Sequence, residues 1–358
     1  MVSDLEPAAT TALRRRTIGI TAYGCGEDET VLFHRLASAH DVAVTTTPAP
    51  LSVDTAARSE GHRCVSVDHT SMVDGPSLRA LAAAGVRLVS TRSIGLDHID
   101  LDAADELGVT VRNVRYSPDG VADFTVMLLL MAVRRARGLM GAAARGAGPD
   151  GVPGRTLGDL TVGIVGAGSI GQAVIHRLEA FGCRVLACSN RPHPAVPATF
   201  VPLDDLLRRS DVVSLHVPLG PATRHLIGRS ELAAMRPGAV LVNTGRGALV
   251  DTEALIGALE RGHLGGAALD VLEGEAAGSG PGTPAGPDVD RFRSRLLRLP
   301  EVVLTPHAAY RTTGTLHEIV DRTLESCRAF ESRRTFESRV IEGCTAFGSS
   351  TASEGSRA

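Results

Sequence analysis

Three segments that lie far apart in the sequence each place one chemically useful side chain just after a predicted strand. These side chains are Arg246, Glu275 and His307. A guanidinium offers a planar fork of donors for a carboxylate. An imidazole titrates near neutral pH and can pass a proton to a carbonyl oxygen, and a neighbouring carboxylate stabilises its charged form. Because ligands of open α/β sheets bind at the carboxyl ends of the strands, the three side chains can converge on one substrate. The set suits the reduction of a 2-keto acid.

A glycine-rich turn, Gly166-Ala-Gly168-Ser-Ile-Gly171, follows a predicted strand over residues 162–165 and opens a predicted helix over residues 172–180. In that context the glycines permit a tight turn and let the backbone approach a pyrophosphate held at the helix N-terminus. The motif predicts a dinucleotide-binding site. The alternative is a glycine turn without a ligand.

The residue at the end of the next predicted strand bears on the choice of cofactor. An Asp or Glu there would accept hydrogen bonds from the ribose hydroxyls of NAD. Ser189 stands in that place and is followed by Asn190 and Arg191. The missing carboxylate and the nearby guanidinium favour NADP(H) over NAD(H). The alternative is that Arg191 is a solvated loop residue and the choice of cofactor is loose.

The elements that must position these residues alternate between short β-branched runs and helical stretches, which is typical of α/β proteins with parallel sheets. The pattern predicts two Rossmann-like, doubly wound parallel-sheet domains. In the first domain a helix begins at Glu27 and another covers residues 75–84. Its predicted strands cover residues 17–22, 42–46, 64–67, 88–91 and 110–113.

The second α/β series follows a long apolar helix, predicted over residues 119–137, and a loop rich in Gly, Pro and Arg over residues 142–158. A second loop covers residues 276–288, a helix covers 318–334, and the small polar tail 343–358 is expected to be disordered. The predicted strands of this series cover residues 161–165, 184–188, 212–215, 239–242, 264–269 and 302–305.

Composition excludes several classes of function. The chain has 358 residues, of which 43% are hydrophobic and 22% charged, and a formal net charge of −3. These values predict a globular protein of two domains. The small net charge does not predict a surface that binds nucleic-acid phosphates. All 37 basic residues are arginines. The absence of lysine excludes a Schiff-base lysine, a Walker-type phosphate lysine and the kinase lysine.

The sequence contains no recognisable disulfide, targeting or metal-binding motif. The six cysteines form no CxxC pair and are expected to be buried free thiols. The N-terminal residues 1–16 lack the pattern of a signal peptide. The longest apolar run, residues 121–133, is shorter than the ~18 residues that a membrane span needs. We therefore expect a cytoplasmic protein, and because no His, Cys, Asp or Glu cluster has metal-ligand spacing, we expect no metal.

From residue 17 to about residue 334, the chain resembles the D-isomer-specific 2-hydroxyacid dehydrogenases. Within that family it is most similar to the D-lactate dehydrogenases, and over residues 115–123, 131–134 and 265–275 to the vancomycin-resistance type, which supplies D-lactate for a modified cell-wall precursor. The motifs that carry the resemblance are the glycine-rich turn, His216-Val217-Pro218 with Thr223, Asn243-Thr244-Gly245-Arg246-Gly, Leu269-Asp270-Val with Glu275, and Pro306-His307.

The resemblance implies a discontinuous substrate domain made of residues 1–115 and 306–345, a dinucleotide-binding domain over residues 116–305, and a disordered tail over residues 346–358. It also implies a homodimer, with much of the contact made by the helix that begins at Asp119.

The resemblance also implies roles for the site residues. Arg246 would bind the substrate carboxylate, His307 would donate the proton and Glu275 would keep His307 protonated. Ile94 and Gly95 match a loop whose backbone amides also hold the carboxylate. Two positions, Tyr116 and Tyr310, match aromatic residues that shape the substrate pocket. The positions that match cofactor contacts are Ser169, Ile170, Val217, Pro218, Thr223, Thr244, Gly245 and Asp270, together with the three glycines of the turn.

The remaining histidines have weaker signals. His216 lies at a strand end before Val217 and is expected to border the cofactor. Four others have no partner pattern and are expected to have surface or packing roles: His69, His98, His225 and His263.

The implied reaction is hydride transfer from a reduced nicotinamide to C2 of a short 2-keto acid, pyruvate first, which gives the D-2-hydroxy acid. One alternative is the same chemistry on hydroxypyruvate, glyoxylate or branched 2-keto acids. Another is a nucleotide-sensing regulator that does not catalyse, although such a protein has no evident need for Arg246, Glu275 and His307 together. Formate dehydrogenation is disfavoured, because relatives with that activity carry Gln where Glu275 stands.

Overall fold

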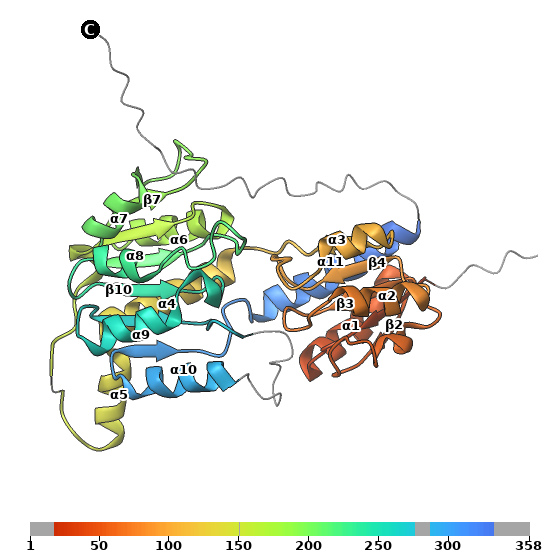
Figure 1. The fold of residues 1–358 in the computed structure, drawn as a ribbon, viewed down its shortest axis with the longest axis horizontal. Helices are drawn as coiled ribbons and strands as arrows, with labels where there is room; N and C mark the ends of the chain where they lie inside the picture. Colours follow the sequence, from red (N-terminus) through yellow and green to blue (C-terminus); the bar gives the residue numbers. More distant parts are fainter. Residues whose placement is uncertain (1–17, 150, 276–286, 333–358) are drawn as a thin grey trace, which may run out of the picture.

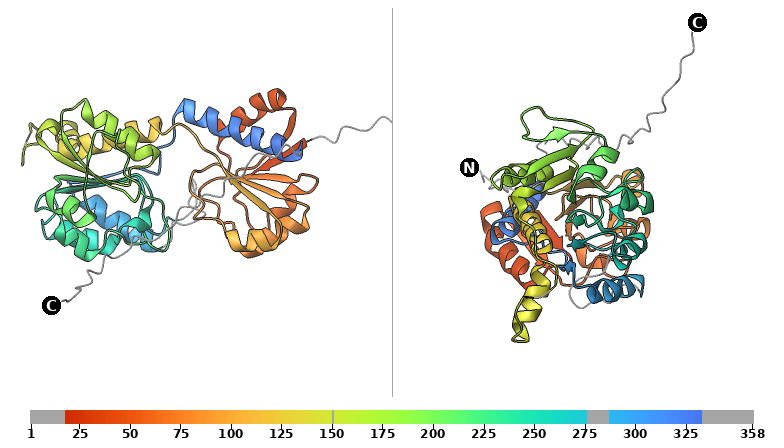
Figure 2. Two further views of the ribbon diagram at one scale, coloured as in Figure 1. Left: turned by 90° about the horizontal axis from the view of Figure 1, so that it is seen from above. Right: turned by 90° about the vertical axis from the view of Figure 1, so that its left-hand side faces the viewer.

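The computed structural model describes residues 18–149, 151–275 and 287–332. They form two lobes that lie side by side along the long axis of the molecule (Figure 1). Each lobe is built on one parallel sheet, and helices cover both faces of each sheet (Figure 2). The prediction of two doubly wound parallel-sheet domains is confirmed.

The smaller sheet has five parallel strands in the order β2-β1-β3-β4-β5. The strands β3 and β4 are buried along their whole length, which explains why they consist of apolar, β-branched or small residues and contain no charged side chain. All five strands match the predictions, although Thr17, where the first was expected to begin, lies outside the described residues. Their bounds are β1 Ile18–Ala22, β2 Val42–Thr46, β3 Cys64–Val67, β4 Leu88–Thr91 and β5 Thr110–Asn113.

Helices from both ends of the chain cover the smaller sheet. The helix α11 (Thr313–Glu331) follows the last strand of the other lobe, yet its Leu324 and Cys327 pack in one core cluster with Phe33 of α1. Figure 1 shows α11, in blue, beside the red and orange N-terminal elements. The smaller lobe is therefore discontinuous in sequence. Its N-terminal helices are α1 Glu27–His40, η1 Ala56–Ser59, α2 Gly75–Ala83 and α3 Leu101–Glu106.

The larger sheet has seven parallel strands in the order β12-β11-β10-β9-β6-β7-β8. Six of them were predicted, and the short edge strand β8 was not. The strands β7 and β8 lie on one side of β6, and β9 lies on its other side. Such a reversal of strand order creates the crevice in which doubly wound sheets bind ligands. The bounds are β6 Thr161–Val165, β7 Arg184–Cys188, β8 Thr199–Phe200, β9 Val212–Leu215, β10 Val240–Asn243, β11 Gly266–Leu269 and β12 Val302–Leu304.

Helices on the two faces of the larger sheet bury separate core clusters. The apolar helix α4 crosses one face and packs beside α6, and the opposite face is covered by α8, α9 and their neighbours. Asp251 caps α9 by accepting a hydrogen bond from the backbone N–H of Ala254. The helices are α4 Asp119–Val133, α5 Ala136–Ala144, η2 Leu157–Asp159, α6 Ser169–Glu179, α7 Leu203–Arg209, α8 Arg229–Ala234, η3 Gly247–Leu249, α9 Thr252–Glu260 and α10 Pro287–Arg298.

The single helix predicted over residues 119–137 is wrong, because it is broken after Val133. Arg135 has a φ angle of 51°, a left-handed conformation that ends the regular α-helical hydrogen bonding. No Gly or Pro marks the break in the sequence. The second helix, α5, then continues to Ala144, so the first residues of the loop predicted over 142–158 are helical, and η2 takes its last residues.

Two further boundaries differ from the predictions. The helix expected over residues 318–334 begins at Thr313, because the Thr312 side chain caps it by accepting from the backbone N–H of Thr315. The helix α10 was not predicted, and it includes Pro287 and Asp288, which were assigned to the loop 276–288. The rest of that loop and the predicted tail, 343–358, lie outside the described residues.

The chain passes between the lobes twice, and the two passages lie together. The segment before α4 is tied to α11, since the backbone N–H of Ser117 donates to Glu318 Oε2 at 2.9 Å. Close by, the Cα of Gly120 faces Thr312, and a Cβ at that glycine would lie 3.0 Å from the Thr312 methyl group. The two passages are therefore held against each other between the lobes.

Among the helices of residues 18–149, 151–275 and 287–332, none combines the length and hydrophobicity needed to cross a membrane. The five cysteines in these ranges are free thiols, as predicted. Cys25, Cys64, Cys188 and Cys327 are buried, whereas Cys183 is only partly buried. The sixth, Cys344, lies outside the described residues.

The glycine-rich turn generates a prediction about stability. A Cβ at Gly171 would collide with the carbonyl oxygen of Gly166, whereas a Cβ at Gly168 would meet no atom within 4 Å. We therefore expect Gly171→Ala to destabilise the protein by about 1–3 kcal/mol, as overpacking does, and to lower the Tm in calorimetry. Gly168→Ala is the matched control and should leave the Tm unchanged. Equal Tm losses would show that this close contact does not position α6.

Candidate active site

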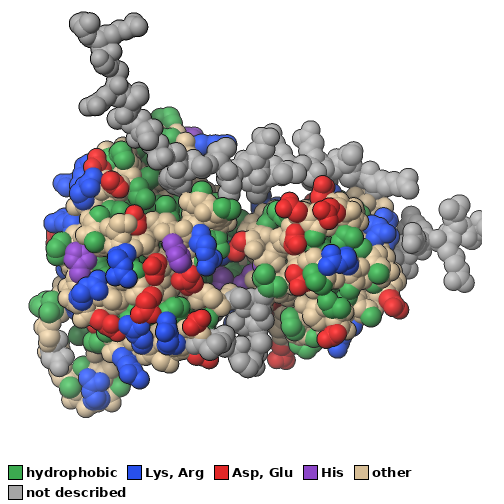
Figure 3. All heavy atoms as spheres, viewed as in Figure 1, with side chains coloured by type: hydrophobic (Ala, Val, Ile, Leu, Met, Phe, Trp, Pro, Cys, Tyr) green, Lys and Arg blue, Asp and Glu red, His purple; other side chains and the backbone are tan. Residues whose placement is uncertain are grey.

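The loops that follow the strands of both sheets meet in the notch between the lobes. Figure 3 shows this notch, with histidine side chains in it. The larger sheet contributes Arg246 after β10, Glu275 after β11 and His307 after β12. The smaller sheet contributes the loop that contains Gly95, after β4. Because the site includes residues from both lobes, it depends on how the lobes are held together.

Arg246 projects from a tightly fixed turn. The Asn243 side chain brackets this turn, since its Nδ2 donates to the carbonyl oxygen of Arg246 at 2.8 Å and its Oδ1 accepts from the N–H of Gly245 at 3.0 Å. From there Arg246 reaches the other lobe. Its Nε lies 3.0 Å from Oδ1 of Asp97 in an ion pair, and a Cβ at Gly95 would collide with its Nη2. A larger residue there would displace the end of the guanidinium, so the glycine permits this close approach.

Arg92 anchors the loop after β4 from behind. Its guanidinium is buried and forms an ion pair with Glu29 at 2.9 Å. It also donates to Oγ of Ser66 at 3.1 Å and to the carbonyl oxygen of Tyr23 at 2.8 Å. Burial is compensated by a partner at each donor, as a buried charge requires. Arg92 therefore holds the loop in place, and its guanidinium is not available to bind a substrate carboxylate.

The carbonyl groups of this loop are fixed, while two of its amides are available. The Asn113 side chain donates to the carbonyl oxygen of Ile94 at 2.7 Å, and Ser93 Oγ donates to that of Gly95 at 2.6 Å. Among the described residues, no acceptor is hydrogen-bonded to the backbone N–H of Ile94 or of Gly95. Two unused donors beside the Arg246 guanidinium suit a carboxylate, and the role of Ile94 and Gly95 in binding one stays a prediction.

His307 is held in place by a buried carboxylate. Asp270 is fully buried, and its oxygens accept from Oγ1 of Thr305 at 2.6 Å and from the N–H groups of Ala308 and Ala309 at 2.9 and 2.8 Å. Its carbonyl oxygen accepts from the N–H of His307, which has a φ angle of 53°. The sequence motif predicted a cofactor contact for Asp270. The structure adds a role that this prediction missed, because the carboxylate fixes the unusual backbone of the proton-donor candidate.

Glu275 and His307 lie together, as predicted, but without a hydrogen bond. Their nearest atoms, Oε2 and Nδ1, are 3.9 Å apart. Burial raises the pKa of Glu275 to about 7. Burial also lowers the pKa of His307 well below its usual value, and Arg246 and a protonated His69 lower it further. Near neutral pH in the unliganded site, His307 is therefore neutral and Glu275 is partly protonated.

Aromatic rings form the wall beside His307. Tyr310 lies edge-on to it, with ring centroids 6.4 Å apart, and Tyr116 is held in the same region, where burial raises its pKa to about 12. His69 lies closer, at 4.3 Å from His307 between ring centroids. The sequence analysis gave His69 only a surface or packing role and missed its place in the site. Its position directly after β3, at the carboxyl edge of the sheet, was the signal that could have found it.

The glycine-rich turn fits a dinucleotide. Gly166 has a φ angle of 97°, and a Cβ there would lie 2.6 Å from the carbonyl oxygen of His216. Gly168 is exposed and has open space where a Cβ would be, directly before Ser169 and Ile170 at the start of α6. A pyrophosphate can approach the backbone there, at the positive end of the helix dipole.

The other predicted cofactor residues line the ends of β9 and β10. Burial lowers the pKa of His216 to about 4, so its ring is neutral, and it pairs with Ser214 at 2.9 Å. Thr223 Oγ1 donates to the carbonyl oxygen of Pro218 at 2.7 Å and fixes the turn that includes buried Val217. Thr244 is hydrogen-bonded to Thr125 of α4 at 2.8 Å. These contacts shape one continuous edge beside the glycine turn.

Ser189 follows β7, and its side chain forms a local hydrogen bond within the next turn. Its Oγ accepts from the backbone N–H of Arg191 at 3.3 Å. Arg191 is exposed, and in the part of the chain that the structure describes, no carboxylate lies within ion-pair distance of it. The structure therefore presents a guanidinium, and no acidic side chain at position 189, where a ribose would lie.

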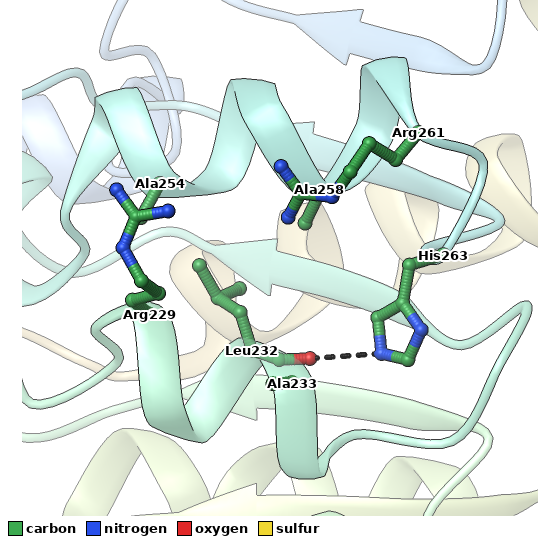
Figure 4. Close-up of a pocket in the computed structure, with 7 residues that line it drawn as sticks. All are labelled: Arg229, Leu232, Ala233, Ala254, Ala258, Arg261 and His263. Carbon is green, nitrogen blue, oxygen red and sulfur yellow. Dashed lines mark hydrogen bonds between the residues drawn. The ribbon is translucent and has the colours of Figure 1, made fainter.

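The other histidines have packing or surface roles, as predicted. His98 is buried and bonded to Oγ1 of Thr91 at 2.9 Å, and His225 pairs with Glu273 on the surface. His263 Nε2 donates to the carbonyl oxygen of Leu232 at 3.1 Å, in a small surface pocket between α8 and α9 (Figure 4). That pocket contains none of the predicted site residues. Within the described ranges, no group of three or more His, Cys, Asp or Glu could hold a metal ion.

Comparison with known proteins agrees with this geometry. Residues 126–309 match the family described as "D-isomer specific 2-hydroxyacid dehydrogenase, NAD binding domain". The chain belongs to the D-isomer-specific 2-hydroxyacid dehydrogenase family. A D-specific alpha-keto acid dehydrogenase of Enterococcus faecium is 46% identical over 321 residues, which cover 89% of this chain and 99% of the relative.

Solved structures of this family have the same fold. The pyruvate reductase of Chlamydomonas reinhardtii matches with a TM-score of 0.80 and 32% identity, over 89% of this chain and 98% of that one. The NAD-complexed D-isomer-specific 2-hydroxyacid dehydrogenase from Lactobacillus delbrueckii ssp. bulgaricus matches with a TM-score of 0.76 and 30% identity, over 89% and 99%. The chain is therefore an oxidoreductase of the D-2-hydroxyacid dehydrogenase type with a nicotinamide cofactor.

Proposed function

We propose that this dehydrogenase reduces pyruvate, or a similarly short 2-keto acid, to D-lactate or the matching D-2-hydroxy acid. The observation that carries the proposal is the pairing of Arg246 with the unused amides of Ile94 and Gly95, in the same notch as His307. A small 2-keto acid has a carboxylate, which these three donor groups can bind. It also has a carbonyl oxygen, to which the nearby imidazole can give a proton. The similarity to a pyruvate reductase supports pyruvate as the substrate.

Each side chain would have a separate task in this reaction. Arg246 and the loop amides would bind the carboxylate, while the cofactor, when bound along the glycine turn and the ends of β9 and β10, supplies hydride from its nicotinamide ring. His307 would give a proton to the carbonyl oxygen. Tyr116, Tyr310 and the surrounding loops would exclude water, which strengthens the charge interactions inside the site.

Binding of the substrate carboxylate would also prepare the proton donor. The charge of Arg246 lowers the pKa of His307 in the unliganded site. A bound carboxylate neutralises that charge, so the pKa of His307 rises. The proton that Glu275 holds can then be shared with His307, and the ionised Glu275 stabilises the imidazolium.

The pH dependence and the His307 variant test this reaction. Reduction requires the proton of the Glu275–His307 pair, which is lost as the pH rises above about 7, the raised pKa of Glu275. We therefore expect kcat/KM for pyruvate reduction to fall on the alkaline side, and the reverse oxidation to rise there. His307→Asn should lower kcat by ~10²–10⁴-fold while the nicotinamide cofactor still binds. The assay is the loss of absorbance of the reduced nicotinamide.

The exposed histidine of α6 provides the control, and His176→Gln should keep wild-type rates. Wild-type turnover only with hydroxypyruvate, glyoxylate or branched 2-keto acids would keep the mechanism and change the substrate. Full activity of His307→Asn would contradict the assignment of the proton donor. No turnover with any 2-keto acid would favour a nucleotide-sensing regulator.

We further propose that the enzyme prefers NADPH, because Ser189 leaves no carboxylate to repel a 2′-phosphate and Arg191 is exposed nearby. The matching change is Ser189→Asp, which restores a carboxylate at the ribose position. We expect it to raise KM for NADPH about tenfold or more and to improve the use of NADH. Arg191→Gln should weaken NADPH alone. A wild type that uses NADH better than NADPH would contradict the proposal, and NAD(H) would then be the cofactor.

The biological setting follows from the same resemblance. We propose that the product D-lactate enters a modified cell-wall precursor, as in glycopeptide resistance, and that the enzyme works in the cytoplasm, where reduced nicotinamide is made. We also propose the domain division expected from the sequence, with residues 1–115 and 306–345 binding substrate and residues 116–305 binding the dinucleotide. The discontinuous packing of α11 supports that division.

We propose that the enzyme is a homodimer that uses α4 and α5. Along these helices Met127, Leu139 and Met140 expose 40%, 43% and 66% of their surface, and burial of such side chains favours association. Met140→Glu should shift the mass in light scattering from twice the chain mass toward the single chain. Val53→Glu, which changes an exposed apolar residue of the other lobe, is the control. A wild type of single-chain mass would contradict the proposal.

A further inference from the structure

The ring of His69 forms a contact between the lobes that the proposed reaction leaves unused. His69 follows β3 of the smaller sheet, and His307 follows β12 of the larger sheet. Their ring centroids are 4.3 Å apart with the planes inclined by 57°. His69 also lies edge-on to Tyr310, at 5.3 Å between centroids. The imidazole of the proton-donor candidate is thus held on one side by a ring from the opposite lobe.

Among the described residues, no hydrogen bond fixes the ring of His307. The nearest carboxylate oxygen, on Glu275, lies 3.9 Å from Nδ1 of His307, beyond hydrogen-bond distance. The backbone of His307 is fixed through Asp270, but that contact ends at the main chain. In the unliganded site, ring packing against His69 and Tyr310 therefore orients the His307 side chain.

The charges around His69 favour its neutral form at neutral pH. Burial lowers its pKa, and the cations Arg246 and Arg92 lower it further, against the opposing charges of Asp68 and Glu29. A positive charge on His69 in turn lowers the pKa of His307. Two imidazolium ions at this separation would repel each other, so the two rings compete for one proton. The other titratable groups near this pair are His98, Tyr116, Tyr310 and Glu275.

We propose that His69 is a positioning residue for the proton donor: its ring orients His307, and protonation of His69 in acid disfavours the protonated form of His307. The inference rests on the proposed function of His307. The alkaline limit of the reduction belongs to the Glu275–His307 pair.

Two substitutions separate the ring from its charge. His69→Phe keeps a ring against His307 and removes the titration, while His69→Ala removes both. A matched control is His34→Gln, which changes an exposed histidine of the same lobe. Circular dichroism of each variant establishes that it is folded before it is compared with the wild type.

The first readout is the titration of the His307 imidazole by NMR in the unliganded protein, with His307→Asn used to assign its signals. We expect the pKa of His307 to rise by about one unit in His69→Phe, because the competing cation is gone, and to be unchanged in His34→Gln. The same midpoint in the wild type and in His69→Phe would overturn the proposal.

The second readout is the steady-state kinetics of pyruvate reduction. His69→Ala should lower kcat about 10- to 100-fold, as misplacement of a catalytic group does, with little change in KM. His69→Phe, which keeps a ring against His307, should keep kcat within a few-fold of the wild type. Wild-type kcat in His69→Ala would overturn the proposal. If the wild type reduces no 2-keto acid, the proposed function fails, and the NMR titration still decides whether the two histidines are coupled.

Discussion

The site depends on the buried carboxylate of Asp270, which fixes the backbone of the segment that carries His307. It lies at the end of β11 and accepts one hydroxyl and two backbone N–H groups from the segment after β12, each a charge-assisted hydrogen bond worth about 1.5–3 kcal/mol. That segment carries His307 in a left-handed backbone conformation and then passes to the other lobe as α11. One carboxylate therefore positions the proposed proton donor, His307, and the passage between the lobes. Without it, three donors would lose their partner.

Fixed charges on the two lobes complete the site. Arg92 and Glu29 hold the loop of Ile94 and Gly95 from within the smaller lobe, and Arg246 reaches that loop from the larger one. Arg246 is paired with Asp97 at 3.0 Å in the unliganded protein, so its guanidinium is already oriented across the notch. Burial, His69 and this same positive charge all lower the pKa of His307. Under the proposed function, a substrate carboxylate would neutralise the charge of Arg246 and so couple substrate binding to proton donation.

Much of this arrangement could be predicted from the sequence because it depends on local patterns. Buried parallel strands are rich in β-branched and apolar residues, so every strand except the short edge strand β8 was found close to its true bounds. Arg246, Glu275 and His307 each follow such a strand and meet at the carboxyl edge. The break after Val133 was missed because two arginines show no preference for the left-handed conformation that Arg135 adopts. The contacts of His69 and Asp270 were missed because they depend on residues distant in sequence and, for His69, on the other lobe.

The configuration of the product tests the central claim most directly. Pyruvate, reduced nicotinamide and the wild-type enzyme are incubated, and the lactate formed is separated on a chiral column. We expect D-lactate alone, because Arg246, the loop amides and His307 fix the orientation of the keto acid relative to the cofactor. L-lactate, a racemic product or no lactate would contradict this account of the site.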